Sequence, residues 1–151
     1  MHVHIDRWDV WNMDTTLARI VHPMLLKLKE QKHGSPSVDD EDVPDELKST
    51  NAPPKENDWD TDDFHHDRWD WVLDEIIWTF SQLQKGDNGD SMFYSGDSDI
   101  LFEPIEDGKL FEMKRGPKDT FRVDDEGKKA HYKRIENGLR LFAKYYFGLW
   151  D

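Results

Sequence analysis

The chain of 151 residues contains no cysteine. Disulfide bonds, thiolate metal sites and thiol nucleophiles are therefore excluded, and this absence fits a reducing compartment. Long apolar runs are also missing, because no stretch approaches the roughly 20 residues that a membrane-spanning helix needs. The N-terminus lacks the basic start and the apolar core of a secretion signal. We therefore expect a soluble protein of the cytoplasm that makes no contact with membranes.

Basic residues are scarce: 20 Lys and Arg stand against 33 Asp and Glu, which gives a formal net charge of −13. Nucleic acids and membrane surfaces are polyanions that favour clustered Lys and Arg, so we expect no direct binding to either. The charge is unevenly placed. Residues 35–75 hold 15 acids and 3 bases, whereas residues 126–151 hold 3 acids and 6 bases. The C-terminal segment is therefore a basic island in an acidic chain.

Large aromatic side chains are abundant, with seven Trp and eight Phe in a chain that is only 36% hydrophobic. Each buried aromatic removes about 150–250 Å² from water, so a few of them can anchor a core. The length suits one domain, residues 1–151. We expect an α+β fold that is mainly α, in which three amphipathic helices pack together with a short N-terminal strand and a small antiparallel β meander.

Apolar spacing predicts the three helices. The first begins near Asp14, is kinked or broken at Pro23 and is closed by Gly34. Its apolar face holds Leu17, Ile20, Val21, Met24 and Leu28. The second spans about residues 62–84, with Trp69, Leu73, Ile76, Phe80 and Leu83 at offsets 0, 4, 7, 11 and 14. The third is capped by Asp124 or Asp125 and presents Tyr132, Ile135, Leu139, Phe142, Tyr146 and Leu149.

Three other segments break this helical pattern. Val3 and Ile5 alternate with polar residues, as in a short strand. Residues 35–58 combine four prolines with an acidic run, which predicts a long loop that is functional, packed as an Ω-loop or mobile. Residues 91–123 hold three β-rich pieces, separated by turns at 106–109 and 116–119, and predict the meander as an insertion.

Two groups of side chains could bind a metal ion. Asp67, Asp70, Asp74 and Glu75 lie at offsets 0, 3, 7 and 8 on the second helix, as a Mg²⁺ ladder requires. His2 and His4 could meet His65 and His66. No facing helix supplies a second set of carboxylates, so we favour a solvent-facing acidic edge and surface histidines. We expect no catalytic residue, no metal, no cofactor and no enzymatic activity.

Tryptophans together with basic residues predict a binding surface instead. Trp69, Trp71 and Trp78 cannot all face inward, because Trp71 lies about 200° from Trp69 on a helical wheel. Aromatic and basic side chains together are typical of interfaces and of base-stacking sites. Tyr145 and Trp150 fall off the centre of the third apolar face, which predicts an interface at the tail. The candidate ligand-binding residues are Lys32, His33, Trp69, Trp71, Lys133, Arg134, Arg140 and Trp150.

Three stretches of the sequence have an unusual residue pattern. They are VHIDRWDVWNMDTTLARIVHPMLLKLKEQKHGSPSVDDEDVP, WDTDDFHHDRWDWVLDEIIWTF and HYKRIENGLRLFAKYYFGLWD. Together they cover more than half of the chain, and they resemble an uncharacterised protein family of tailed phages that is common in marine ones. Longer relatives carry an additional N-terminal segment, so this chain looks like a compact form. The resemblance implies a viral protein in the cytoplasm of an infected bacterium, and it transfers no activity.

Three functions compete on these observations. In the first, which we favour, a homo-oligomer counters host immunity by sequestering a nucleotide-derived signal without catalysis. The base would stack on tryptophan and the phosphates would meet Lys and Arg. In the second, the acidic residues 38–75 mimic DNA, or the protein binds and inhibits a host DNA-binding protein. In the third, Asp67, Asp70, Asp74 and Glu75 serve a Mg²⁺-dependent nucleotide hydrolase.

Overall fold

The computed structural model describes residues 4–150, and its secondary structure is mainly helical. The α-helices are α1 (Met13–Gln31), α2 (His65–Leu83) and α3 (Asp125–Lys144). The strands are β1 (Tyr94–Ser95), β2 (Ile100–Ile105), β3 (Leu110–Arg115) and β4 (Arg122–Val123). Short 3-10 helices are η1 (Asp40–Asp42), η2 (Asp45–Leu47), η3 (Ser49–Asn51), η4 (Asp90–Phe93) and η5 (Tyr146–Gly148). The expected class, mainly α with small antiparallel strand pairs, is confirmed.

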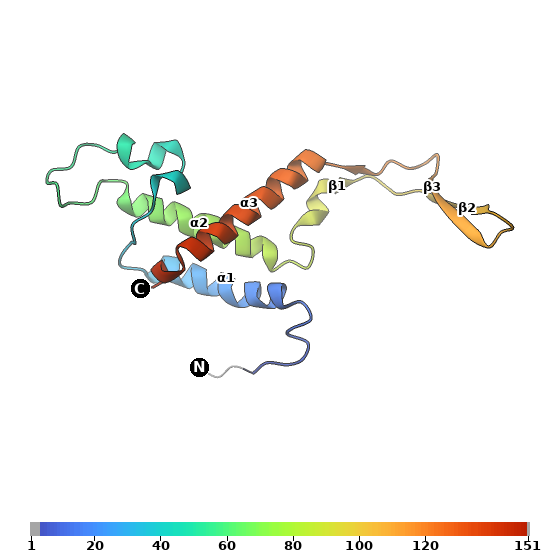
Figure 1. Cartoon of the computed structure of the whole chain (residues 1–151), viewed down its shortest axis with the longest axis horizontal. Helices are drawn as coiled ribbons and strands as arrows, with labels where there is room; N and C mark the ends of the chain where they lie inside the picture. The colour runs from blue at the N-terminus through green and yellow to red at the C-terminus, as the bar shows by residue number, and fades with distance from the viewer. Residues whose placement is uncertain (1–3, 151) are drawn as a thin grey trace. The chain divides into compact units, whose positions relative to one another are not determined.

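The chain divides into two compact units. The first, Met1–Asn88 with Lys133–Asp151, holds α1, α2 and most of α3, and we call it the helical unit. The second, Gly89–Tyr132, holds the four strands and the first turns of α3, and we call it the hairpin unit. Figure 1 shows both units, and each is described by itself below.

Helix α2 is the centre of the helical unit. Its predicted apolar stripe is buried, because Trp69, Leu73 and Ile76 are each at most 1% exposed and Phe80 is 6% exposed. Helix α1 packs along α2. Helix α3 also contacts α2, since the rings of Phe80 and Phe142 lie 4.9 Å apart. Both neighbours therefore pack on one central helix.

Helix α1 differs from its prediction in two ways. It runs through Pro23 without a break and ends at Gln31, before Gly34. Core contacts on both sides of Pro23 hold the helix together, because Ala18 and Leu25 are buried. The predicted apolar face is also buried only in part: Val21 and Leu28 pack against the core, whereas Leu17, Ile20 and Met24 are 48%, 53% and 61% exposed. Helix α1 therefore carries apolar side chains on two sides, of which one is open to solvent.

Helix α3 buries only part of its predicted apolar face. Ile135 is buried and Phe142 packs against the core, whereas Leu139 and, beyond the end of the helix, Tyr146 are exposed. Gly138 and Leu141 are buried although they lie off the predicted face. The physical reason is a close approach to α2, because a Cβ on Gly138 would lie only 1.9 Å from Thr79 Oγ1. Tyr145, predicted to lie off the core, is therefore buried, and its ring meets Trp69 edge to face at 6.0 Å.

The predicted N-terminal strand is not present in the described part. Val3 lies outside the described residues, and Ile5 belongs to no strand. Local carboxylates hold this segment in turns instead of an extended conformation. Asp6 Oδ1 accepts a hydrogen bond from the Trp8 amide at 3.0 Å, and Asp9 Oδ2 accepts one from the Asp6 amide at 2.7 Å.

The acidic Pro-rich loop, residues 35–58, is packed over part of its length. It forms η1, η2 and η3, and Val38 and Val43 belong to the hydrophobic core. Asp42 is also buried, with 4% of its surface exposed. Of the three outcomes expected for this loop, the packed one describes residues 38–47 best.

The strands of the hairpin unit form two separate ladders in place of one meander. β2 pairs with β3, from Ile100 opposite Arg115 to Ile105 opposite Leu110. The predicted turn joins them, with Gly108 at a left-handed φ of +72°. β4 pairs with β1 and not with β3, because residues 116–119 form a turn in which Asp119 N donates to Gly116 O at 3.2 Å.

Candidate functional site

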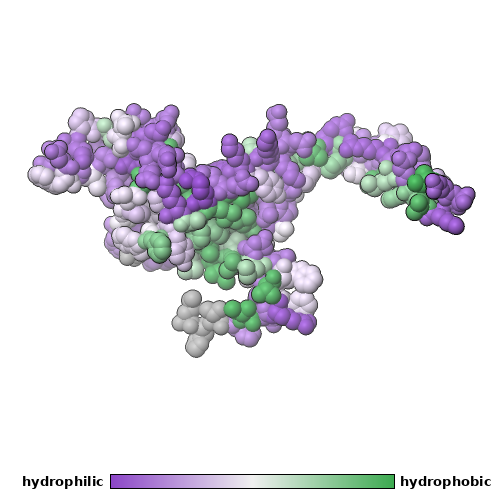
Figure 2. All heavy atoms as spheres, in the orientation of Figure 1, coloured by the Kyte–Doolittle hydropathy of each residue, from purple (hydrophilic) through white to green (hydrophobic). Residues whose placement is uncertain are grey.

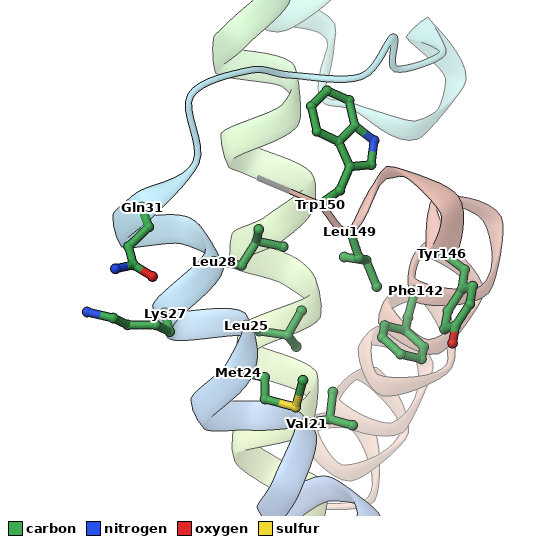
Figure 3. A pocket seen from close by; sticks show the side chains of 10 residues that line it. All are labelled: Val21, Met24, Leu25, Lys27, Leu28, Gln31, Phe142, Tyr146, Leu149 and Trp150. Atoms are coloured by element: carbon green, nitrogen blue, oxygen red, sulfur yellow. The ribbon is translucent and has the colours of Figure 1, made fainter. Parts of the chain in front are cut away.

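An apolar groove lies in the helical unit between α1 and the end of α3, and it encloses about 600 Å³. Figure 3 shows side chains of the two helices directed toward each other across this groove. Its lining is Val21, Met24, Leu25, Lys27, Leu28, Gln31, Phe142, Tyr146, Leu149 and Trp150. Six of these ten side chains are aliphatic, phenyl or thioether groups, and Tyr146 and Trp150 add two further aromatic rings, so the groove suits an apolar ligand surface.

The groove exists because α1 and α3 both pack on α2. Leu25 points toward the core and is 3% exposed, so it forms a fixed floor. At one end the chain leaves η5 and brings Trp150 against the segment that follows α1. A Cβ on Gly34 would lie 3.5 Å from the Trp150 ring, so the indole rests on the backbone there.

The rim of the groove is exposed and apolar. Met24, Tyr146 and Trp150 are 61%, 57% and 54% exposed. On α1 the same surface continues through Met13, Leu17 and Ile20, which with Met24 lie at offsets 0, 4, 7 and 11. This is the spacing of a helix face that contacts another helix. Figure 2 shows hydrophobic atoms gathered over this part of the helical unit.

Charged groups near the groove are few. Lys27 lies on its edge and pairs with Glu30 on the same helix at 2.7 Å, with both side chains exposed. An exposed pair of this kind contributes little to stability. The groove therefore offers shape and apolar area, and its edge offers one loosely held cation.

Most cations that were predicted to bind phosphate are paired with carboxylates of the same chain. Lys32 Nζ lies 2.8 Å from Asp70. Arg134 donates to both Glu75 oxygens, at 2.9 and 2.6 Å, and lies 3.8 Å from the centre of the Trp78 ring. The pair with Glu75 raises the pKa of Arg134. A phosphate would have to displace these carboxylates, which weakens the support for an anion site there.

Arg140 follows the same pattern. Its Nη1 lies 2.7 Å from Asp42 Oδ1, and two other guanidinium nitrogens donate to Asn137. Lys133 differs, since it is exposed on α3. His33 is also exposed, on the segment after α1.

The predicted aromatic contacts lie in different places. Trp69 is 1% exposed within the core, and Trp71 is partly buried against it. Trp150 is the one predicted ligand residue that lines the groove. The structure therefore does not gather the predicted ligand residues into one site.

The suspected carboxylate ladder on α2 is divided among several basic partners. Asp74 pairs with Lys29 of α1, Asp70 with Lys32 and Glu75 with Arg134 of α3. Asp67 is exposed near the start of the helix. These contacts explain the acidic edge as ion pairs that link α2 to its neighbours.

The suspected histidine site is likewise engaged by the chain. His65 Nε2 lies 3.1 Å from the Ser35 carbonyl oxygen, and His66 Nδ1 lies 2.9 Å from Ser35 Oγ. His4 is exposed, and His2 lies outside the described residues. The two described ring contacts fix the start of α2 to the acidic loop.

Three carboxylates in the acidic loop have the separation of metal ligands: Asp39, Glu41 and Asp42. The ammonium of Lys144 lies among them, 2.7, 3.0 and 2.5 Å from their oxygens. Hydrogen bonds to these three groups raise the pKa of Lys144. A lysine therefore supplies the positive charge that a metal ion would bring.

Asp42 is the buried member of this cluster. Burial alone would raise its pKa, but hydrogen bonds from Lys144, Tyr145 and Arg140 outweigh burial and lower it. Tyr145 Oη donates to Asp42 Oδ2 at 2.6 Å and accepts from the Asp39 amide at 3.0 Å. Burial, together with that bond to Asp42, raises the pKa of Tyr145 to about 12. These groups join the loop to α3.

The hairpin unit has its own polar cluster. Lys128 Nζ lies 2.7 Å from Asp90 Oδ2 and 2.6 Å from Tyr94 Oη. Tyr94 Oη donates to the same Asp90 oxygen at 2.9 Å. The hydrogen bond from Lys128 is the main reason that the pKa of Asp90 is lowered. The cluster links η4 to the first turns of α3.

The groove residues Met24, Phe142 and Tyr146 were not among the predicted ligand residues, because their spacing assigned them to core faces. One signal in the sequence could have revealed the groove. The apolar positions of α1 extend around more of the helix than one core contact requires, since Ala18 and Leu25 lie beside Leu17, Ile20 and Met24.

Within residues 4–150, no helix has both the length and the apolar character needed to cross a membrane. Comparisons with protein-family models, with curated proteins and with solved structures found no match to this chain.

Proposed function

We propose that the chain is a non-enzymatic accessory protein that binds a protein of the infected bacterium, and that its groove takes an amphipathic helix of that partner. The observation that carries this proposal is the exposed apolar rim of Met24, Tyr146 and Trp150 above a fixed floor at Leu25. The setting in an infected cell follows from the resemblance to phage proteins.

A helix is the occupant that fits best. The groove lies between two helices, and the stripe from Met13 to Met24 repeats at the spacing with which helices contact each other. The twelve residues from Met13 to Met24 extend about 17 Å along the helix axis, which is roughly three turns of a partner helix. Partner helices of this kind present apolar anchors at positions i, i+3 or i+4 and i+7.

Selection of peptides tests this function. A library of helix-forming peptides is selected against the whole protein, and binders are compared on Met24→Glu and Leu26→Glu variants. Leu26 is the matched control, because it is 47% exposed on α1 about 200° around the helix from Met24. We expect binders with helically spaced apolar anchors that lose at least about tenfold in affinity to Met24→Glu and little to Leu26→Glu.

A nucleotide sponge is the second candidate, and one observation favours it. Trp150 lines the groove with 54% of its surface exposed, and Lys27 is the one cation among the lining residues. A base could stack on the indole while Lys27 meets a phosphate. Equilibrium dialysis with cyclic dinucleotides and ADP-ribose derivatives separates the two candidates. A depletion that Trp150→Ala abolishes would favour the sponge, and no depletion at protein excess would exclude it for those compounds.

A further inference from the structure

The β2–β3 hairpin has one apolar and one charged face. The register places Ile100, Phe102 and Pro104 on the same face as Phe111 and Met113, with Arg115 at the base end. The opposite face carries Leu101, Glu103, Ile105, Leu110, Glu112 and Lys114. On that face Lys114 pairs with Glu103 at 2.6 Å and with Glu112 at 3.1 Å. We call this second face the charged face because its charges, Glu103, Glu112 and Lys114, lie among three apolar residues and pair with one another. The first face carries five apolar side chains and Arg115.

Within the hairpin unit, no residue covers this apolar face. All residues of β2 and β3 are exposed, and Phe102, Phe111 and Met113 are 65%, 61% and 66% exposed. A two-stranded hairpin is marginal by itself, and three or more strands with a hydrophobic face are needed for stability. Figure 2 shows hydrophobic atoms at the β2–β3 hairpin.

We infer that two copies of this chain dimerise through the apolar faces of their hairpins, packed face to face and antiparallel. Two stacked hairpins make a four-stranded sandwich in which each copy covers the other. The same patch meets itself, as a twofold interface requires.

Charge determines the direction of the two hairpins. Arg115 lies at the base end of the apolar face. Its Nη1 is 3.3 Å from Asp119 Oδ2 of the same chain, and its side chain is still 70% exposed. Glu106 and Asp107, followed by Lys109, occupy the turn at the other end and give it a net negative charge. An antiparallel pair brings each Arg115 near the acidic turn of the other copy, whereas a parallel pair would bring the two Arg115 side chains together.

The available area predicts a weak dimer. A Phe side chain offers about 150–250 Å², so two mostly exposed Phe with Ile100 and Met113 present roughly 400–500 Å² per copy. Two faces then bury about 800–1,000 Å², which is near the lower limit for a specific interface. We expect a dissociation constant on the order of 10 μM.

Analytical ultracentrifugation of the full chain tests the dimer, from about 1 μM to about 300 μM. The wild type is expected to change from monomer to dimer over this range. Phe102→Glu should weaken the dimer at least about tenfold, whereas Leu101→Glu, its neighbour on the charged face, should have little effect. A wild type that stays monomeric, or a dimer that Phe102→Glu leaves unchanged, would overturn the inference.

A charge exchange keeps the test independent of folding defects. Arg115→Glu gives a copy with acid at both ends, and Glu106→Lys with Asp107→Asn gives a copy without an acidic turn. Each should dimerise poorly alone. Mixed together they should form heterodimers, because the base end of each copy then meets a turn of opposite charge on the other copy. If mixing restores no dimer, the antiparallel arrangement is wrong.

Discussion

At the scale of single residues, the contact between α2 and α3 depends on Gly138. The missing side chain lets α3 approach Thr79, whose hydroxyl is fully buried. A Cβ at this position would lie 1.9 Å from Thr79 Oγ1 and 2.7 Å from its Cβ. Neither atom can move far, since Thr79 is fully buried in the last turns of the packed helix α2.

Gly138→Ala should therefore destabilise the helical unit by about 1–3 kcal/mol, as overpacking in a core does. A loss of stability on this substitution would be informative, because Ala in a helix is otherwise favoured over Gly by about 1 kcal/mol. Chemical denaturation measures the effect. Gly86→Ala is the control, since nothing lies within 4 Å of its added Cβ. Equal stability of the two variants would show that the helices are not in close contact here.

The pKa of Asp42 makes a second residue-scale prediction. Its value in the folded state lies below the ordinary 3.8, so the folded protein binds its proton less readily than the unfolded chain. The stability from this group is present above about pH 4 and is lost as the pH falls below that value. Asp42→Asn should cost about 1–3 kcal/mol at neutral pH, because it weakens three hydrogen bonds to a buried carboxylate.

Denaturation of wild type and Asp42→Asn across acidic pH checks this. The difference between them should shrink as the pH falls below about 4. A constant difference in the free energy of unfolding between wild type and Asp42→Asn, down to the acid transition, would contradict the assigned role of Asp42.

Tyr145 has the opposite pH dependence. Its pKa is raised to about 12, so its contribution to the free energy of unfolding is lost as the pH rises from about 10 through 12.

At the scale of elements, Lys144 is the residue that fastens the acidic loop to α3. One ammonium reaches Asp39, Glu41 and Asp42, and the loop contributes Val38 and Val43 to the core. The loop thereby acquires order that its composition does not predict.

Lys144→Met should loosen this loop while the helices stay folded. Hydrogen exchange should become roughly tenfold faster at the Asp39 and Asp42 amides, which donate to Tyr145 Oη and to the Asp39 carbonyl oxygen. Lys27→Met is the control, because Lys27 pairs only along α1 with Glu30 among its described contacts. Unchanged exchange in the loop would mean that its apolar anchors suffice without the lysine.

The sequence predicted the existence and type of the elements better than their orientation. The stripe of α2 was predicted correctly because this helix is apolar on the side that both neighbours cover. The buried side of α3 was predicted only in part, through Ile135 and Phe142, because its closest contact with α2 is at Gly138 and glycine carries no hydrophobic signal. The ladder of β1 with β4 joins residues far apart in the chain, which local patterns do not encode.

At the scale of the whole molecule, the hydrophobic core of the helical unit is built from residues of that unit. Every buried member of the core cluster lies in the helical unit. Asp97 and Thr120 lie at the base of the segment 98–119, which contains the β2–β3 hairpin. Thr120 N donates to the Asp97 carbonyl oxygen at 3.0 Å.

Replacement of residues 98–119 by an Asn-Gly turn should therefore leave the helical unit folded. Circular dichroism should show the helical signal of α1, α2 and α3 unchanged, and the melting midpoint should lie within a few degrees of the wild type. The shortened chain should also remain monomeric at high concentration. Loss of the helical signal would show that the hairpin contributes to folding after all.

The candidate site could be predicted from the sequence only in part. Trp150 could be placed at an interface from its position off the apolar face, and it lines the groove. Lys32, Arg134 and Arg140 could not be recognised as internally paired, because their carboxylate partners come from other elements. Which charges remain available to a ligand is decided by tertiary contacts.

The methionines of the chain allow the most direct test of the groove. Met24 lies on its rim and Met13 on the adjoining stripe, whereas Met92 belongs to the hairpin unit. With methyl-labelled methionine, each side chain reports in one NMR spectrum during titration with a selected helical peptide. A helix in the groove should shift the Met24 and Met13 signals and leave Met92 in place. Saturable binding that leaves Met24 unmoved would contradict the proposed function.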